Sequence, residues 1–509
     1  MVGAVPSGPV ERLSTNDLTV LATDRGSVPM NIAAALVLDR ARDLSLAELG
    51  TLLDLRLSAV PRLRQRLSVT PVGCGRPVWV DDASFSLQRH LSGRSVSTET
   101  ELLEVVADLG STRLDPQLPL WRAVLVQGLP GDRSALVLVL HHVLADGLGG
   151  LAVLAALTDG APGTDRSSSQ PSGAFPRPAP DLRDLALDSA RAHVAGLRGL
   201  PAALARGLRG LQELGLGNRP RLAVRPSLNQ PTGGRRRLSL AAVPLADVAA
   251  AAHRAGGTVN DVVLAAVVGA LSDTLAARGE HPEQIVVSVP VAARRGADTA
   301  HLGNEVGVRP VAVPTLAHHH ERLAAVIGLT HAARPATRAA SAAPLGLAFR
   351  TLARAKLFQF FIERQRLVHT FETNLRGPRD ALHLGGHRIS GIVPAVVSPG
   401  NVGVSFTVLS YAGELTVTVV ADPDLLPEQD RLTHSLASLW TPCAAASWGD
   451  GARLPRRPGR EFGALPDREC RRRSPRGSCC PSVGLCLLLE LQQVVEAGSG
   501  GNLTAARWW

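Results

Sequence analysis

Two adjacent histidines are the residues of this sequence best placed to do chemistry. His141 and His142 follow an apolar run at 135–140, and Asp146 and Gly147 come shortly after them. A free histidine has a pKa of roughly 6.5, so a neutral imidazole accepts a proton near neutral pH. A hydroxyl group held beside that nitrogen becomes a competent nucleophile. The motif therefore indicates general-base catalysis at one of the two histidines.

The same motif also has a purely structural interpretation. Paired histidines often pack or face solvent, and Asp146 is well placed to be the N-cap of a helix that follows it. A pattern this short also matches by chance. Spacing alone favours the structural interpretation, so other parts of the chain must decide between the two.

The flanking segments predict how the motif is presented. Residues 135–140 are apolar and branched, which suits a strand buried on both faces, and the apolar residues 148–157 indicate a helix. Side chains alternate across a strand, so one histidine can face a cavity while the other packs. The sequence predicts a strand, a reactive turn and a helix.

The start of this helix offers a competing motif. Residues 147–152 match the dinucleotide fingerprint with alanine in place of its third glycine. That fingerprint also needs a second strand that ends in an acidic residue about 20 positions later. The chain instead enters a stretch rich in Gly, Pro and Ser. This disfavours nucleotide binding.

Composition limits the partners. A chain of 509 residues is longer than one core normally uses, so we expect two lobes. The net charge of +10 is compatible with a nucleic acid, an anionic lipid or a phosphorylated cosubstrate. Lys356 is the single lysine among 54 basic residues. Aromatic residues make up 3% and do not interleave with the arginines, which argues against nucleic-acid binding.

The sequence also suggests a location. Residues 1–12 lack a basic segment followed by an apolar core, and no uninterrupted apolar run reaches about 18 residues. We therefore expect a cytoplasmic protein that is neither secreted nor membrane-spanning.

Metal-binding patterns are weak. The cysteines form no CxxC pair, which disfavours a zinc site or a disulfide framework. His318, His319 and His320 are consecutive, but neighbouring positions on a helix diverge by about 100° and chelate one ion poorly. We expect a solvated helix face there and no metal site.

Changes in pattern divide the chain into four parts. Residues 1–157 alternate predicted strands and helices, including a helix at 44–60 with Asp43 as its cap. Residues 158–233 begin as a linker and continue as an arginine-bearing amphipathic helix at 182–216. That helix suits either an anionic membrane surface or a crossover packed between the lobes.

The second lobe spans residues 234–442. Thr258 is the predicted cap of a long apolar helix that runs to about residue 275. Asn260 and Asp261 in its first turn are either caps or site residues facing the lobe interface. Strands are predicted at 285–291, 304–313 and 369–374, a hairpin at 401–420 and a helix at 426–439. Residues 443–509, rich in Arg, Pro and Cys, lack periodicity, and we expect a low-order tail.

Six separated stretches resemble one protein family. The chain is similar to the bacterial wax ester synthase/diacylglycerol acyltransferase family, within the wider group of chloramphenicol acetyltransferase and peptide-synthetase condensation domains. The match covers residues 13–439, and six matches in the family's order make coincidence improbable. The stretches are Pro119-Leu120-Trp121, His141-His142 with Asp146-Gly147, Asn260-Asp261, Pro290-Val291-Ala292-Ala293-Arg294, Leu302-Gly303-Asn304 and Thr373-Asn374-Leu375-Arg376-Gly377-Pro378.

The resemblance implies an α/β, two-lobed chloramphenicol acetyltransferase-like fold with mixed sheets and an active-site tunnel between the lobes. It implies His142 as general base, His141 as its support, and Asp146 as a structural residue paired with an arginine, for which Arg294 is our candidate. Acyl-CoA would enter one mouth of the tunnel and the acyl acceptor the other. Other residues that the motifs single out are Gly147, Asn260 and Asp261 as supporting residues, and Pro119, Leu120, Trp121, Asn304 and Asn374 as tunnel candidates.

Acyl transfer from a thioester needs few protein groups. The thioester is already activated, so the enzyme must position an alcohol, remove its proton and stabilise charge on the carbonyl oxygen. A base contributes roughly two to four orders of magnitude. The chain contains no GxSxG element, which favours direct transfer over an acyl-enzyme. We expect no cofactor beyond acyl-CoA as cosubstrate.

The sequence departs mildly from the family pattern. Thr373 stands where a serine is expected, Leu375 where a valine is expected, and Ala292 replaces a common serine. These changes bear on substrate preference more than on activity.

The main hypothesis is an O-acyltransferase that makes triacylglycerol from diacylglycerol and also wax esters from long-chain alcohols, peripheral to the inner membrane or to lipid bodies. One alternative is a catalytically silent lipid-binding or lipid-droplet protein of the same fold. Another is a transferase that takes its acyl group from a carrier protein, as condensation domains do.

Overall fold

The apolar run before the histidines forms the central part of the first lobe. In the computed structural model this run is β6 (Arg133–His141), which is hydrogen-bonded between β1 (Asn31–Leu38) and β5 (Trp121–Leu129). Residues 135–140 are at most 3% exposed, so both faces of the strand are covered, as their apolar pattern predicts. The structure describes residues 10–159, 175–198, 225–292, 302–304, 306–332, 342–396 and 398–440.

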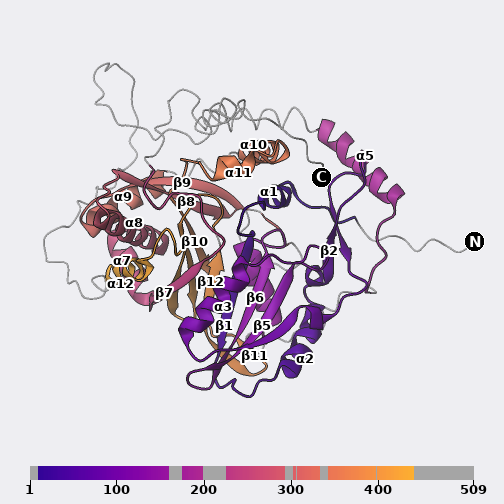
Figure 1. Ribbon diagram of the computed structural model, residues 1–509, viewed down its shortest axis with the longest axis horizontal. Coiled ribbons are helices and arrows are strands. Elements are labelled where there is room, and N and C mark those ends of the chain that lie inside the picture. The colour runs from indigo at the N-terminus through magenta and orange to yellow at the C-terminus, as the bar shows by residue number, and fades with distance from the viewer. Residues whose placement is uncertain are drawn as a thin grey trace, which may run out of the picture.

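Two six-stranded sheets form the two lobes (Figure 1). The first has the order β11-β12-β1-β6-β5-β4, with β4 at Leu91–Ser95. It takes β11 (His383–Leu384) and β12 (His387–Val396) from the second half of the chain, and β12 pairs antiparallel with β1. Backbone hydrogen bonds therefore tie the two halves of the chain together.

The second sheet is mixed and has the order β7-β14-β13-β10-β8-β9. Its strand β10 runs parallel to both β13 and β8, while the remaining neighbours are antiparallel. The strands are β7 (Arg237–Pro244), β8 (Gln284–Ala292), β9 (Val306–Pro314), β10 (Thr370–Arg376), β13 (Val404–Tyr411) and β14 (Glu414–Ala421).

Helices cover both sheets, and a small two-stranded sheet pairs β2 (Gln65–Ser68) with β3 (Val78–Asp81). The helices of the first lobe and its connections are α1 (Thr15–Thr23), α2 (Leu46–Leu57), α3 (Glu99–Ser111), α4 (Gly147–Leu157) and α5 (Leu182–Arg198). Those of the second lobe are α7 (Leu245–Ala255), α8 (Val259–Ala277), α9 (His319–Ala332), α10 (Ala342–Arg354), α11 (Phe358–Ile362) and α12 (Gln429–Ser438).

Helix caps explain where two of these helices begin. Thr258 caps α8 as predicted, and the Asp261 carboxylate accepts a hydrogen bond from the Thr258 amide at 2.7 Å. The predicted cap of α2 is wrong: Ser45 rather than Asp43 precedes the helix, because Ser45 and Glu48 form a capping box. Helix α2 therefore begins two residues later than the predicted helix at 44–60.

The apolar helix α8 is the core helix of the second lobe. Among the described residues it is the one helix long and apolar enough to cross a membrane, and 72% of its apolar window is buried inside the protein. Its side chains pack against β13 and β14, for example Val263 and Val267 with Val408 and Val417 in one buried cluster. Packing thus accounts for its composition.

The amphipathic helix α5 lies at the edge of the molecule (Figure 1). Its buried residue Leu185 packs against Cys74, Val78 and Val80, and Asp188 pairs with Arg12. The described part of α5 therefore rests beside β3 instead of crossing between the two sheets. Residues 199–216 of the predicted helix, and the predicted tail at 443–509, lie outside the described residues.

Candidate active site

His142 lies where two cavities adjoin between the lobes. The larger, cavity A, has a volume of about 320 Å³, and the smaller, cavity B, about 200 Å³. Both are lined by His142, Pro290, Thr373, Val396 and Thr407. The first of these comes from the end of β6, and the others come from strands β8, β10, β12 and β13. A substrate in either cavity can therefore reach the same imidazole.

The two cavities are both largely apolar but differ in the residue types of their walls. Cavity A is bounded by α1, β9 and α10 and has polar groups in its wall, including Asn16, Asn304 and Ser288. Its wall residue Val308 is 49% exposed, so this cavity reaches the surface. Cavity B is lined mainly by aliphatic side chains, which suit a hydrocarbon chain. They are Ile32, Leu138, Leu140, Leu148, Leu151, Leu154, Leu375, Ile392 and Leu409.

The imidazole of His142 is suited to act as a base. Its Nδ1 is buried and has no hydrogen-bond partner among the described residues, and the residue lines both cavities. Burial lowers the pKa of His142 below its ordinary value, and the opposing effects of its own carbonyl, Asn304 and Asp146 do not offset this. The ring is therefore neutral at pH 7 and free to accept a proton.

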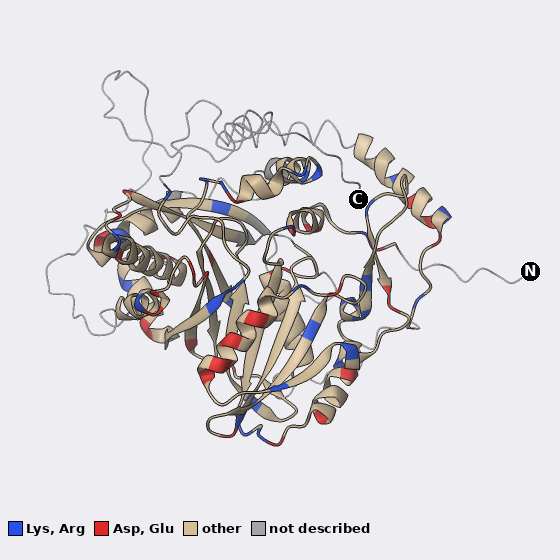
Figure 2. Ribbon diagram, in the orientation of Figure 1, with Lys and Arg blue, Asp and Glu red and all other residues tan. Residues whose placement is uncertain are grey.

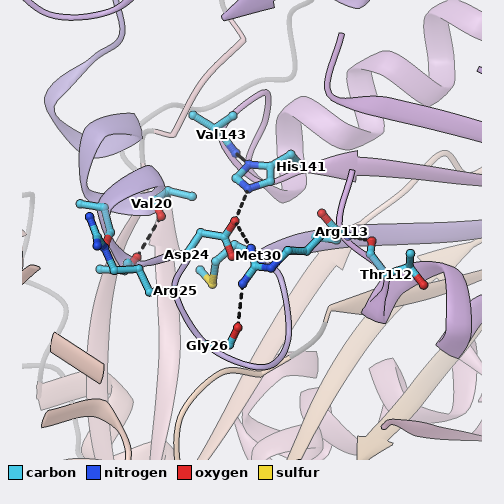
Figure 3. Close-up of polar contacts among 12 residues, drawn as sticks. Val20, Asp24, Arg25, Gly26, Met30, Thr112, Arg113, His141 and Val143 are labelled. Atoms are coloured by element: carbon cyan, nitrogen blue, oxygen red, sulfur yellow. Dashed lines mark hydrogen bonds and ion pairs between the residues drawn. The ribbon is translucent and has the colours of Figure 1, made fainter. Parts of the chain in front are cut away.

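His141 points to the other side of the strand, as alternation predicts, and is held by Asp24 (Figure 3). Its Nδ1 accepts a hydrogen bond from the Val143 amide at 3.0 Å, and its Nε2 lies 3.1 Å from Asp24 Oδ2. Since Nδ1 is an acceptor, Nε2 carries the proton and donates to the carboxylate. His141 is thus fixed in one tautomer, away from the cavities.

Asp24 also organises the backbone beside the histidine motif. It accepts a hydrogen bond from the Met30 amide at 3.1 Å and pairs with Arg113 at 2.9 Å (Figure 3). The Met30 carbonyl in turn accepts from the His142 amide at 2.7 Å. Burial raises the pKa of Asp24, but its hydrogen bond and charge interaction with His141, together with Arg113, lower it overall. Asp24 therefore stays ionised, and no motif in the sequence pointed to it.

Asp146 and Gly147 start the helix after the motif. Asp146 is 1% exposed and is the N-cap of α4, where its Oδ1 accepts from the Gly149 amide at 2.9 Å. Gly147 lines cavity B, and a Cβ at this position would lie 2.7 Å from Leu375 Cδ2. Arg294, the candidate partner of Asp146, lies outside the described residues.

Two asparagines from the second lobe reach the site. Asn304 lines cavity A, and its Nδ2 donates to the His142 carbonyl at 2.7 Å and to Asp17 Oδ1 at 3.0 Å. Asn374 lines cavity B beside Thr373, which lines both cavities. The backbone around His142 is thus braced by the opposite lobe.

Other residues of the predicted site lie elsewhere. Leu120 and Trp121 are buried in the core of the first lobe, and Trp121 Nε1 donates to the Leu63 carbonyl at 2.6 Å. Asp261 is occupied by the cap of α8, with Asn260 beside it. The described linings of cavities A and B contain none of Pro119, Leu120, Trp121, Asn260 and Asp261.

A concavity larger than cavities A and B lies away from the histidine motif. It has a volume of about 930 Å³ and lies between α3 and β7. Many of its charged side chains pair with one another, as Arg133 does with Glu99 and Arg237 with Asp430. The described residues also hold no group of three His, Cys, Asp or Glu side chains that could bind a metal ion.

Sequence comparison assigns the chain to a family. The catalytic domain of the wax ester synthase/diacylglycerol acyltransferase family matches residues 13–263, and the C-terminal domain of the same family matches residues 302–439. The chain belongs to this family. The predicted resemblance is therefore confirmed, and the protein is an acyltransferase of the wax ester synthase/diacylglycerol acyltransferase class.

Known proteins similar to this acyltransferase agree in sequence and in fold. It is 29% identical over 394 residues to a probable diacylglycerol O-acyltransferase of Mycobacterium tuberculosis, covering 75% of this chain and 84% of that protein. The wax ester synthase/diacylglycerol acyltransferase from Marinobacter aquaeolei VT8 superposes with a TM-score of 0.61 at 22% identity, covering 85% of this chain and 99% of that one. The first condensation domain of the CDA synthetase gives 0.56 at 19%, covering 88% and 100%. The predicted chloramphenicol acetyltransferase-like fold is confirmed.

Proposed function

We propose that this acyltransferase transfers a long-chain acyl group from acyl-CoA to the free hydroxyl of diacylglycerol, with long-chain alcohols as a second class of acceptor. The observation that carries the proposal is the position of His142 at the junction of two cavities, together with its lowered pKa. The relatives named as diacylglycerol O-acyltransferases support the choice of acceptor.

The reaction is a direct transfer. His142 Nε2 removes the proton of the acceptor hydroxyl while its oxygen bonds to the thioester carbonyl carbon. The carbon–sulfur bond then breaks, and the imidazolium returns the proton to the CoA thiolate. Thr373 belongs to the wall shared by both cavities, and its hydroxyl is our candidate donor to the carbonyl oxygen. No metal or redox cofactor takes part in this scheme.

The location that fits this proposal is a lipid surface. Diacylglycerol and triacylglycerol partition into membranes and lipid bodies, so the enzyme would act as a peripheral protein there. The exposed apolar side chains of α5, Leu182, Leu187, Val194 and Leu197, are compatible with such contact.

The proposal is tested with purified protein and a long-chain acyl-CoA. CoA release should require diacylglycerol or hexadecanol, and His142→Ala should lower kcat by about 100-fold or more. His253→Ala, which changes an exposed histidine on α7, is the matched control. Release of CoA by the His142→Ala protein at the rate of the parent would refute the assignment of the base.

A further inference from the structure

Three elements of the fold frame the surface opening of cavity A. Thr19 of α1, Val308 of β9 and Phe349 of α10 all belong to its wall. Val308 is 49% exposed, which places the opening at this end of the cavity. Helices α1 and α10 lie side by side there, and positively charged residues mark both β9 and α10 (Figure 2).

Three arginines gather at this opening around the start of α1. Arg350, which follows Phe349 on α10, donates to the Thr15 carbonyl at 3.2 Å and to Thr19 Oγ1 at 3.0 Å. Arg76 donates to Thr15 Oγ1 at 3.4 Å from the loop before β3. Arg354 is exposed one helical turn after Arg350, so both lie on the same face of α10. We call Arg76, Arg350 and Arg354 the arginine cluster.

The charges of the arginine cluster are not balanced by carboxylates. No ion pair to Arg76, Arg350 or Arg354 is formed within the described part of the chain. Burial, followed by the charges of Arg354 and Arg76, lowers the pKa of Arg350. Such a group of like charges is stabilised when an anion binds between them.

Nearby acids are engaged in other contacts. Asp17 caps α1 and accepts two hydrogen bonds from Asn304. Asp24 is held by His141 and Arg113. The arginine cluster therefore has donors left for a ligand, and guanidinium groups match phosphate geometry with paired hydrogen bonds.

We propose that the arginine cluster binds the phosphate groups of the acyl-CoA donor, so that the donor enters through cavity A and cavity B receives hydrocarbon. This inference rests on the proposed function. Of the substrates in that reaction, acyl-CoA alone carries phosphates, since diacylglycerol and long-chain alcohols are uncharged. The residue types of the walls agree with this assignment, because cavity A carries amide and hydroxyl side chains such as Asn16, Asn304 and Ser288, whereas most side chains of cavity B are aliphatic.

The test measures CoA binding by calorimetry on the full-length protein. The double variant Arg350→Gln/Arg354→Gln should raise the Kd for CoA by about tenfold or more, since each lost charged contact weakens binding severalfold. Arg354→Gln alone changes an exposed side chain and should still raise the Kd for CoA severalfold. This single variant therefore still tests the inference if the double variant does not fold. Arg254→Gln on α7 is the matched surface control and should bind CoA as the parent does. Unchanged CoA affinity in both cluster variants would overturn the inference.

A donor without phosphates provides an independent readout. The ratio of kcat/KM for acyl-CoA to kcat/KM for the acyl-pantetheine thioester should fall about tenfold in the double variant and stay constant in the control. An equal loss for both donors would show that the arginines act on structure and would overturn the inference.

Two further outcomes separate the proposals. If the parent turns over acyl-CoA but the ratio is the same in all variants, the inference fails and the proposed function stands. If the parent neither binds CoA nor turns over acyl-CoA, both fail. Vesicles with and without phosphatidylglycerol test the other source of phosphate: loss of vesicle binding with unchanged CoA affinity would assign the cluster to lipid headgroups and overturn the inference.

Discussion

The side-chain amide of Asn304 lies 2.7 Å from the carbonyl oxygen of His142, although the two residues come from opposite lobes. The same amide nitrogen lies 3.0 Å from Asp17 Oδ1. Asn304, which precedes β9, therefore also contacts α1. The backbone that carries the base is therefore positioned by the second lobe. In the proposed mechanism, the position of His142 therefore depends on the alignment of the two lobes.

Removing this contact should affect both stability and rate. Asn304→Ala removes the side-chain donor of the His142 carbonyl and one of the hydrogen bonds to the buried Asp17 carboxylate, a loss of about 1–3 kcal/mol of unfolding free energy. We expect kcat to fall by about tenfold, because the backbone of His142 becomes less well fixed. Thermal unfolding and steady-state kinetics measure the two effects. Asn260→Ala at the start of α8 is the control, and parent-like values for Asn304→Ala would argue against the bracing role.

The Asp24–His141 pair should be visible in the acid stability of the protein. The pKa of Asp24 is lower in the folded protein than its ordinary value of 3.8, so its stabilising contribution is present above that value. The contribution is lost as pH falls through the lower, folded-state pKa. Asp24→Asn should remove this part of the acid-induced loss of stability. Urea unfolding at acidic and neutral pH tests the pair, and parallel pH curves for parent and variant would contradict it.

Glu372 on β10 should destabilise the protein progressively as pH rises from acidic to neutral values. Its side chain is fully buried, its carboxyl oxygens have no hydrogen-bond partner among the described residues, and burial raises its pKa to about 8. The folded state therefore favours the protonated acid, so stability declines as pH rises from the ordinary pKa of 4.5 toward 8. Glu372→Gln should be more stable than the parent at pH 7 by on the order of 1–3 kcal/mol. The measurement is denaturant unfolding between about pH 5 and pH 8, where the difference should grow with pH. A constant difference would rule out titration of Glu372.

Gly147 should control the width of cavity B. A Cβ at this position would lie 2.7 Å from Leu375 Cδ2, so Gly147→Ala forces Leu375 to shift within cavity B. Such overpacking costs about 1–3 kcal/mol, and we expect kcat/KM for long-chain substrates to fall by about tenfold. Gly147→Ala combined with Leu375→Ala should recover most of the loss. Failure of the second substitution to restore activity would place the defect in α4 instead.

Local sequence patterns predicted the elements around the base well. The apolar run at 135–140 predicted the central strand, and Thr258 with Asp261 predicted the start of α8. Both predictions succeeded because each pattern lies within a few neighbouring residues. The strand β12 was not predicted, since Gly391 and Pro394 interrupt its pattern and its pairing with β1 is a long-range contact.

Long-range contacts also explain what the sequence did not reveal about the site. Asp24 lies 117 residues before His141, and no local motif marks their pairing. Trp121, a predicted tunnel residue, is buried in the first lobe because its indole N–H is satisfied by the Leu63 carbonyl and its ring stacks on His90. Some residues of the family motifs therefore pack in the core and others line the cavities. The positions of the cavities are needed to distinguish the two groups.

The pH dependence of kcat/KM for acyl transfer tests the central claim most directly. A neutral His142 must accept the hydroxyl proton, so the rate should be lost as pH falls through the pKa of this residue. Because burial lowers that pKa, the account predicts a midpoint below 6.5 and a constant rate across neutral pH. A rate that does not fall at acidic pH, or a midpoint above 6.5, would contradict the account.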